Sequence, residues 1–280
     1  CMFKNINKKQ IPLLLLNARI TKKTFIKWFK FKNFSKSILK NISVSYPQNL
    51  ETKFYLNKLG IKNIKQIGNL KFSEYEENFE QINKKLSLEL KKKKIWIASS
   101  THANEEVFCA KTHLELKKKY KNLITIIIPR HIHRVKEINS EITNLGLNTA
   151  THSYKPKNLN NIDIYFVDTF GETKKFYKIG SSVFLGGSII LRGGQNPLEA
   201  ARYGARILHG PHVDNFKDVY KLLSKMKISM KITTPKELAY LISFKKNRNT
   251  GNRIKKIGGI ILKKTIKEID NLIINEFKKT

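Results

Sequence analysis

The 280-residue sequence is poor in several features that identify common protein classes. Its two cysteines, Cys1 and Cys109, form neither a disulfide framework nor a CxxC metal knuckle, which favours a reducing compartment. No apolar run reaches the length of a membrane-spanning helix, because the longest runs, 11–16 and 124–128, have the length of buried strands. A P-loop, a G-x-G-x-x-G fingerprint and a G-x-S-x-G elbow are missing. Their absence argues against a P-loop kinase or ATPase, a classical dinucleotide enzyme and a serine hydrolase.

Acidic residues are also scarce, with 21 of them against 55 lysines and arginines, and the formal net charge is +34. Such a charge suits nucleic acid or an anionic membrane surface. However, the excess is nearly all lysine and is spread along the whole chain, as in proteins of AT-rich genomes. Arginine, which dominates specific recognition of phosphates and bases, is rare. We therefore expect no specific nucleic-acid partner.

The predicted secondary structure divides the chain into two α/β domains, residues 1–72 and residues 73–280. Residues 73–94 are charged and amphipathic, which indicates a connector helix. From residue 95 strands and helices alternate, which predicts a doubly wound parallel sheet followed by a basic C-terminal helix. The expected strands are 11–16, 42–46, 64–67, 95–98, 124–128, 164–167, 182–185 and 205–208. The expected helices are 24–34, 48–59, 105–120, 133–145, 173–179, 197–203 and 254–277.

The predicted helix 24–34 carries aromatic rings between lysines. Phe25, Trp28 and Phe29 share one of its faces. Packing in a core is one use of these rings. Contact with a membrane interface is the alternative, because aromatic side chains beside lysines suit lipid headgroups.

A glycine-rich loop follows the predicted strand 182–185 and leads into a helix. Its glycines are Gly186, Gly187, Gly193 and Gly194, and the helix start is Asn196, Pro197, Leu198 and Glu199. Asn196 suits the N-cap, Pro197 the first helical position and Glu199 the acidic position of a capping box. A glycine-rich loop before a helix N-terminus presents unpaired amides to an anion such as phosphate. The loop therefore predicts an anion site, with an ordinary helix cap as the alternative.

Polar residues also follow the other predicted strands, where ligands of doubly wound sheets bind. These candidate segments are 99–102 with Glu105 and Glu106, 129–134, 168–172 and 209–216. Arg130 can direct two donors at a phosphate, and His102 can hydrogen-bond a ligand. His131 and His133 lack the helical spacing of a zinc pair and an acidic partner, so we expect no metal site. The chemistry that fits is a nucleotide held by amides and an arginine, with Glu199 accepting hydrogen bonds from a ribose diol.

Short strings along residues 11–225 resemble those of the 3-deoxy-D-manno-octulosonic acid (Kdo) transferases of Gram-negative lipopolysaccharide synthesis. Each string is weak alone, but together, and in the order of the family, they are specific. The strings are Asn17-Ala-Arg19, Gly68-Asn-Leu-Lys-Phe72, Ser100-Thr-His102 with Glu105-Glu106, Pro129-Arg-His131, Asp168-Thr-Phe-Gly-Glu172, Gly186-Gly-Ser188, Arg192-Gly-Gly-Gln-Asn-Pro-Leu-Glu199 and Gly210-Pro-His212 with Asn215-Phe216.

The resemblance implies a GT-B glycosyltransferase fold. Residues 1–72 would be the second half of the N-terminal, acceptor-side Rossmann-like domain, and residues 73–280 the complete C-terminal domain that binds the nucleotide sugar. The implied reaction is an inverting transfer of Kdo from CMP-Kdo to a lipid A precursor, lipid IVA, without a metal or another cofactor. The implied partners are CMP-Kdo, the lipid A precursor and an anionic membrane surface, at the cytoplasmic face of the inner membrane.

The resemblance also implies roles for individual residues. Lys71 would stabilise the transition state, because a cation there can hold the donor phosphate as it leaves. The implied CMP contacts are Pro129, Arg130, Phe170, Gly171, Glu172, Asn196, Pro197, Leu198 and Glu199. Further possible donor-site residues are His102, Gly186, Gly187 and Ser188.

The sequence departs from the family pattern at several positions. Phe170 replaces the usual methionine, Ser99 stands where glycine is common, and Gln195 replaces a frequent histidine, so a proton role for Gln195 is not expected. The catalytic glutamate and the membrane-anchoring helix of the family precede the segment that this chain matches. No residue here inherits the role of general base. Together with a start at Cys1 that leads directly into a buried strand, this suggests a fragment that binds CMP without turning over.

Two other functions fit parts of the sequence. One is a GT-B transferase that uses a different nucleotide sugar, and the other is a basic module that binds a membrane or nucleic acid. Tighter binding of CMP than of UMP or UDP would favour the Kdo transferase over these two alternatives.

Overall fold

The computed structural model describes the chain apart from residues 1, 74–80, 155, 157 and 278–280. The chain divides into two compact units. The first unit consists of residues 1–75 together with 255–280, and the second unit consists of residues 76–254. The second unit is therefore inserted, in sequence, into the first.

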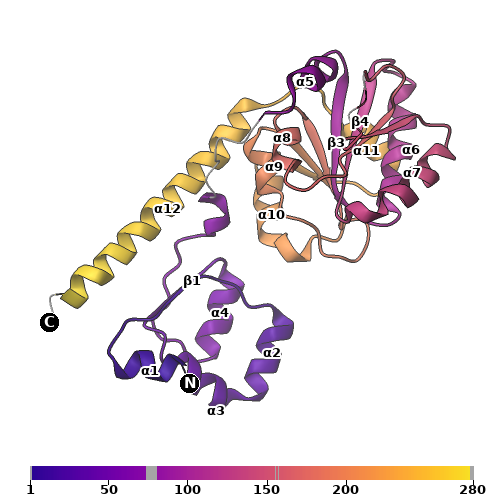
Figure 1. Cartoon of the computed structure of the whole chain (residues 1–280). Coiled ribbons are helices and arrows are strands. Elements are labelled where there is room, and N and C mark those ends of the chain that lie inside the picture. Colours follow the sequence, from indigo (N-terminus) through magenta and orange to yellow (C-terminus); the bar gives the residue numbers. More distant parts are fainter. Residues whose placement is uncertain (1, 74–80, 155, 157, 278–280) are drawn as a thin grey trace. The chain divides into compact units, whose positions relative to one another are not determined.

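The second unit is built on a seven-stranded parallel sheet with the order β5-β6-β4-β3-β7-β8-β9. Figure 1 shows α6, α7 and α11 on one side of this sheet and α8, α9 and α10 on the other. The strands are β3 (Lys94–Thr101), β4 (Leu123–Pro129), β5 (Thr149–Thr151), β6 (Ile164–Phe166), β7 (Ser182–Leu185), β8 (Arg206–His209) and β9 (Ser229–Lys231). The helices are α5 (Lys84–Lys91), α6 (Glu105–Lys117), α7 (Val135–Thr143), α8 (Thr173–Tyr177), α9 (Leu198–Arg202), α10 (Lys217–Lys225) and α11 (Pro235–Leu241).

The central strands are apolar along nearly their whole length because helices cover both faces of the sheet. Every residue of β4 is buried. Trp96 in β3 and Phe184 in β7 are completely buried beside it. The predicted doubly wound sheet is thus confirmed. Its core lies between the sheet and the helices on each of its faces, around β3 and β4.

One buried polar cluster connects α6 to the sheet. The two ring nitrogens of His113 lie 2.8 Å from Thr125 Oγ1 and 3.4 Å from Asp163 Oδ1. Burial lowers the pKa of His113 to about 4, although the Asp163 carboxylate opposes this effect. Burial also tends to raise the pKa of Asp163, but hydrogen bonds from Lys117 and the Asn148 amide outweigh it and lower that pKa. The cluster therefore pairs a neutral histidine with an ionised carboxylate.

The first unit contains a small parallel sheet of β1 (Leu14–Ala18) and β2 (Val44–Pro47). Its other elements are the helices α1 (Met2–Lys8), α2 (Lys22–Lys30), α3 (Lys32–Leu39) and α4 (Leu50–Lys58) and the 3-10 turn η1 (Leu70–Ser73). Leu39, Leu56, Leu59 and Ile61 form its buried core. The helix α12 (Arg248–Phe277) begins in the second unit and continues through the first.

The C-terminal helix groups with the first unit from residue 255 onward, whereas the sequence-based division kept it with the second domain. The reason lies in its contacts. Lys65 Nζ is 2.6 Å from Glu268 Oε2, and Ile261 packs where a side chain on Gly68 would come within 2.9 Å of it. Gly258 approaches the Phe72 backbone. The hydrophobic pattern predicted the helix, but it does not show which part of the chain the buried face of the helix packs against.

Several elements differ from those expected. The predicted helix 24–34 is interrupted at Phe31 and forms α2 and α3. The predicted strand 64–67 is only an isolated bridge between Ser45 and Ile64. The sequence did not predict β5, β9, α10 or α11, and the two strands are three-residue segments at the sheet edges without an apolar run. The connector helix at 73–94 contains α5, and its residues 74–80 lie outside the described residues.

Two adjacent glycines of α12 provide a test of how this helix packs in the first unit. A Cβ atom on Gly258 would lie 2.0 Å from Phe72 O, while one on Gly259 meets nothing within 4 Å. We expect Gly258→Ala to lower the free energy of unfolding by about 1–3 kcal/mol through overpacking. Gly259→Ala should instead raise it by about 0.5–1 kcal/mol, because alanine favours the helix. Urea unfolding of the two variants measures the difference, and equal effects would contradict the packing of α12 on η1.

Candidate functional site

The carboxyl ends of the parallel strands meet at one edge of the second unit's sheet. The chain runs from β3 to its neighbour β4 and later returns to β7 on the other side of β3, which creates a topological switch point. Two backbone hydrogen bonds hold the three strand ends together there. Arg130 N donates to Thr101 O at 2.9 Å, and Gly186 N donates to Ser99 O at 2.9 Å. The segments that the sequence singled out after β3, β4 and β7 are thus neighbours.

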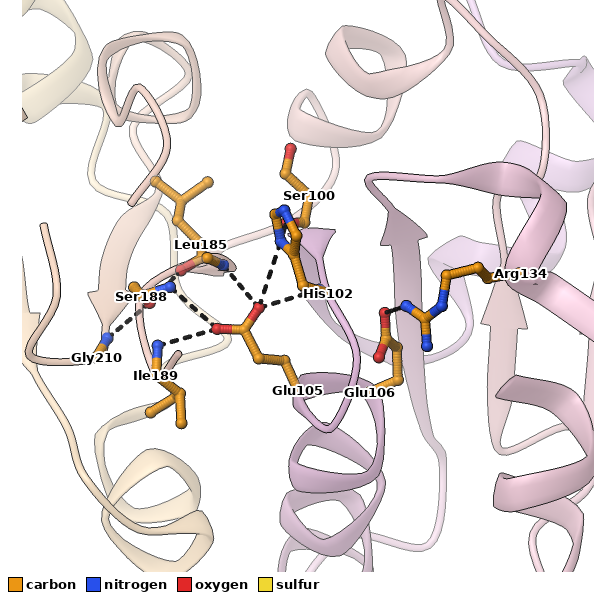
Figure 2. A network of polar contacts seen from close by, with 10 residues as sticks. Ser100, His102, Glu105, Glu106, Arg134, Leu185, Ser188, Ile189 and Gly210 are labelled. Carbon is orange, nitrogen blue, oxygen red and sulfur yellow. Dashed lines mark hydrogen bonds and ion pairs between the residues drawn. The ribbon is translucent and has the colours of Figure 1, made fainter. Parts of the chain in front are cut away.

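A buried carboxylate, that of Glu105 at the start of α6, connects the two loops at the switch point (Figure 2). Its Oε2 accepts hydrogen bonds from Gly187 N at 2.6 Å and His102 N at 3.0 Å. Its Oε1 accepts from Ser188 N at 3.0 Å and Ile189 N at 2.9 Å. Glu105 is completely buried, so these four charge-assisted hydrogen bonds replace the water that the carboxylate loses.

The glycine loop approaches β3 too closely for larger residues. A Cβ atom on Gly186 would lie 2.4 Å from Ser100 O, and Gly187 has a φ of +65°, in the left-handed region. Ser188 extends the contact to the next strand, because its Oγ donates to Leu185 O at 2.5 Å and accepts from Gly210 N at 2.8 Å. The loops after β3, β7 and β8 are therefore one hydrogen-bonded assembly.

This assembly changes the interpretation of the glycine-rich loop. The sequence predicted that its amides bind a ligand anion, but the amides of Gly187, Ser188 and Ile189 already donate to Glu105, and that of Gly186 donates to the sheet. For these four amides the protein supplies the acceptor itself. Contacts of Gly186, Gly187 and Ser188 with a donor substrate stay a prediction, and such contacts would not use these amides.

His102 lies beside this carboxylate. Its Nδ1 is 3.1 Å from Ser100 O and 3.8 Å from Glu105 Oε2. Burial lowers the pKa of His102, His131 and Arg192 lower it further, and the Glu105 carboxylate opposes them. The ring of His131 stands edge-on to that of His102, with centroids 5.8 Å apart. The side chain is therefore neutral near pH 7.

The second acid in the first turn of α6, Glu106, is also completely buried. Its Oε1 pairs with Arg134 Nη1 at 3.2 Å, and Arg134 follows β4 in the sequence. Burial raises the pKa of Glu106, while the guanidinium of Arg134 opposes that effect. The helix dipole also favours acids in the first turn of a helix, but these buried contacts are the larger part of the role of Glu105 and Glu106.

The residues that the resemblance assigns to CMP after β4 and β6 present different surfaces. Pro129 is buried and Arg130 is exposed. Phe170 is 81% exposed, and Gly171 has a φ of +82° with open space around it. Glu172 Oε1 accepts a hydrogen bond from Lys175 Nζ at 2.9 Å. The turn therefore offers an exposed ring and an open backbone segment next to a paired carboxylate.

The helix start after the glycine loop differs by one residue from the prediction. α9 begins at Leu198 with Pro197 as its N-cap and without a side-chain capping bond, whereas Asn196, the predicted N-cap, lies one residue earlier and its Oδ1 accepts from Leu198 N at 3.2 Å. Glu199 lies in the first turn and is half-buried. Leu198 is completely buried, so its side chain packs in the core and any ligand contact it makes uses its backbone.

Lys71 lies in the first unit, on the turn η1. Asn69 Oδ1 accepts from Lys71 N at 3.0 Å, and Asn17 Oδ1 accepts from Leu70 N at 3.1 Å. Asn17 belongs to the Asn-Ala-Arg string at the end of β1, so two strings of the resemblance meet in space. The hydrogen bonds fix the backbone that carries Lys71, whose catalytic role stays a prediction.

Sequence reasoning missed three polar contacts at this edge of the second unit. The hydroxyls of Ser99 and Tyr177 are 2.7 Å apart in the core, where burial raises the pKa of Tyr177. Asp168 accepts hydrogen bonds from Ser153 N at 2.9 Å and Ser153 Oγ at 2.5 Å. His152 Nε2 lies 3.8 Å from Glu172 Oε2. No local spacing signals these pairs, because their members are 15 to 78 residues apart. In addition, His152 and Ser153 follow the edge strand β5, which was not predicted.

Within the described part of the chain, no group of three or more histidine, cysteine, aspartate or glutamate side chains is arranged to hold a metal ion. Among its helices, none combines the length and the apolar character needed to cross a bilayer.

The Glu105 contacts predict a large effect of a small substitution. Glu105→Gln keeps the shape but turns one acceptor oxygen into an NH₂ group that faces two amide donors. We expect the free energy of unfolding to fall by about 2–4 kcal/mol, since charged hydrogen bonds are lost and a buried group is left unsatisfied. Glu115→Gln on the same helix, whose partner Lys118 is exposed, should cost less than about 1 kcal/mol. Equal losses in thermal or urea unfolding would show that the Glu105 contacts carry no special weight.

Several known proteins resemble this chain in sequence. Residues 1–74 match the family model described as 3-deoxy-D-manno-octulosonic-acid transferase (kdotransferase). The chain is 34% identical over 249 residues to the 3-deoxy-D-manno-octulosonic acid transferase of Rickettsia bellii, covering 88% of this chain and 59% of that protein. It is 28% identical to the enzyme of the same name from Haemophilus influenzae, over 78% and 52% of the two chains. The chain thus spans about half the length of the curated relatives it matches.

Solved structures share the fold. The C-terminal CMP-Kdo binding domain of WaaA from Acinetobacter baumannii matches with a TM-score of 0.51 and 21% identity, over 62% of this chain and 90% of that one. The trehalose-6-phosphate synthase OtsA matches with a TM-score of 0.53 and 11% identity, over 99% and 70% of the two chains. These neighbours are GT-B glycosyltransferases, which confirms the predicted fold class. By its family-model match, its sequence relatives and its fold, the chain belongs to the 3-deoxy-D-manno-octulosonic acid transferase family.

Proposed function

We propose that this chain forms the donor-binding part of an enzyme that transfers Kdo from CMP-Kdo to a lipid A precursor such as lipid IVA, with inversion and without a metal ion. The observation that carries this proposal is the strand-end edge of the second unit. There the residues after β4, β6 and β7 that the resemblance assigns to CMP gather in one sheet, and a solved relative of this unit is named for CMP-Kdo binding. Ligands of doubly wound sheets bind at such a switch point.

The geometry suggests how the donor is divided among the residues. Since Glu105 already holds the amides of Gly187, Ser188 and Ile189, we assign the donor phosphate to a side chain, and the exposed Arg130 can bind two of its oxygens. The exposed ring of Phe170 can lie against the cytosine base, and the open backbone at Gly171 lets the base approach. Glu199, in the first turn of α9, can accept hydrogen bonds from the ribose diol.

Two further roles follow from the resemblance and remain proposals. Lys71 neutralises the donor phosphate as the bond to Kdo breaks, because a fixed cation stabilises charge that develops in the transition state. The family's general base is a glutamate that no residue of these 280 matches. We therefore expect the chain to bind CMP but not to transfer Kdo, since loss of a general base alone typically costs about 10²–10⁴-fold in rate.

Calorimetry with CMP, UMP and UDP tests the donor assignment. We expect CMP to bind most tightly, and Arg130→Ala to weaken CMP by about 1.5–3 kcal/mol, the scale of a charge-assisted hydrogen bond. Lys136→Ala, an exposed cation on α7, serves as the control and should leave CMP affinity unchanged. Tighter binding of a uridine nucleotide would favour a different nucleotide-sugar donor, and unchanged affinity in Arg130→Ala would remove Arg130 from the site.

The helices α2 and α3 form a surface that suits the proposed membrane partner at the cytoplasmic face of the inner membrane. Phe25 stacks on Tyr55 with ring centroids 4.4 Å apart, so this ring packs inside the unit. Phe31 and Phe34 are 70% and 65% exposed, and Ile26 and Phe29 are also exposed. The lysines of the same helices are Lys22, Lys23, Lys27, Lys30, Lys32 and Lys36. Exposed rings among lysines can enter the headgroup region while each lysine near an anionic surface contributes about 1 kcal/mol.

Vesicle sedimentation tests this membrane surface. We expect binding to vesicles that contain anionic phosphatidylglycerol and much weaker binding to neutral phosphatidylcholine vesicles. The double variant Phe31→Ser, Phe34→Ser should reduce the anionic binding several-fold, whereas Leu50→Ser, an equally exposed apolar residue on α4, should not. Binding that is equal for both lipids, or absent with both, would attribute the lysine excess to genome composition.

A further inference from the structure

The hydrogen-bond partners of His102 fix which ring nitrogen carries the proton. Nδ1 lies 3.1 Å from Ser100 O and 3.8 Å from Glu105 Oε2. Both neighbours are oxygens that only accept hydrogen bonds: a backbone carbonyl and a carboxylate. Nδ1 therefore carries a hydrogen and donates it, because the hydrogen-bond partners of the ring nitrogens determine which of them is protonated.

The other nitrogen, Nε2, has a different situation. Within the described part of the chain, no residue forms a hydrogen bond with it, and the side chain is 13% exposed. The ring is held from several sides, since the backbone amide of His102 is bound by Glu105 and its Cε1 is 3.3 Å from where a side chain on Gly187 would begin. Nε2 is thus the one polar atom of a fixed ring that stays open to a ligand.

The charge of the ring decides what Nε2 can bind. Burial, His131 and Arg192 all lower the pKa of His102, and only Glu105 and the hydrogen bond to Ser100 oppose them. With the ring neutral and Nδ1 protonated, Nε2 presents a lone pair. A lone pair accepts a hydrogen bond from a hydroxyl group and repels the oxygens of an ionised phosphate or carboxylate.

We propose that His102 is a specificity residue that accepts a hydrogen bond from a hydroxyl group of the donor's sugar. This inference rests on the proposed function, because it takes the strand-end edge as the donor site. It also separates two tasks: Arg130, after β4, meets the anionic part of the donor, and His102, after β3, meets its hydroxyl-bearing part. A site built to accept from a hydroxyl rejects analogues without it, because the buried acceptor then stays unpaired.

Two substitutions of similar size separate the two ring nitrogens. His102→Asn places an amide NH₂ near the position of Nδ1 and can keep the hydrogen bond to Ser100 O, but it has no atom at the position of Nε2. His102→Gln reaches the position of Nε2 with an amide oxygen that can accept a hydrogen bond. The asparagine variant therefore removes the proposed contact, and the glutamine variant partly restores it.

The experiment is calorimetry of the 280-residue chain with CMP and with a hydrolysis-resistant phosphonate analogue of CMP-Kdo. CMP should bind the wild type and both variants equally. The analogue should bind the wild type more tightly than CMP does, and His102→Asn should weaken the analogue alone by about five- to tenfold, the value of one hydrogen bond. His102→Gln should recover part of that loss, and an analogue that lacks the Kdo hydroxyls should not distinguish the three proteins.

The outcomes separate this inference from the proposed function. If the wild type binds no CMP, the proposed function fails. If CMP binds and His102→Asn leaves the affinity for the analogue unchanged, or weakens CMP by the same factor, the role of His102 is wrong while the donor assignment stands. Long-range ¹H–¹⁵N correlation spectra give an independent check, because they should show a neutral ring with the proton on Nδ1 at pH 7. A doubly protonated His102 at that pH would overturn the inference and favour an anionic ligand group.

Discussion

The buried carboxylate of Glu105 is the constraint on which the geometry of the site depends. An ionised group in the core is costly unless hydrogen-bond donors surround it, and here the donors are four backbone amides from two loops. Because those loops follow β3 and β7, satisfying one side chain fixes the switch point of the sheet. The glycines are required for the same reason, since a Cβ on Gly186 would collide with β3 and with this carboxylate.

This internal anion determines which groups are left for a substrate. A loop with free amides binds phosphate through its backbone, but here the same geometry is used to join two strands. Recognition consequently falls to side chains of opposite character on neighbouring strand ends. The guanidinium of Arg130 is always charged, while burial, together with His131 and Arg192, lowers the pKa of the His102 imidazole and keeps it neutral.

Much of the fold follows from local patterns in the sequence, and much of the site does not. The apolar runs of β3, β4 and β7 and the alternation with helices predicted the parallel sheet, and the rule for strand ends selected His102, Arg130 and the glycine loop. The role of Glu105 was not predictable, because its partners in the loop are 82 to 84 residues away and a helix-dipole explanation was locally sufficient. Edge strands such as β5 escaped because they bury too little to need an apolar pattern. The residues assigned to CMP came from the resemblance, and the structure adds their surroundings.

The insertion of residues 76–254 between the two segments of the first unit has a consequence for biosynthesis. A ribosome releases residues 1–75 long before residues 255–280, so the first unit must wait for the last part of the chain before its helix α12 can dock on β2 and η1. During that interval the second unit, whose residues are contiguous, can complete its sheet. Domains generally fold as units during synthesis. Here the first unit begins to be synthesised before the second but is completed after it. The early segment is also rich in exposed rings, and exposed apolar surface of this kind favours aggregation while folding is incomplete.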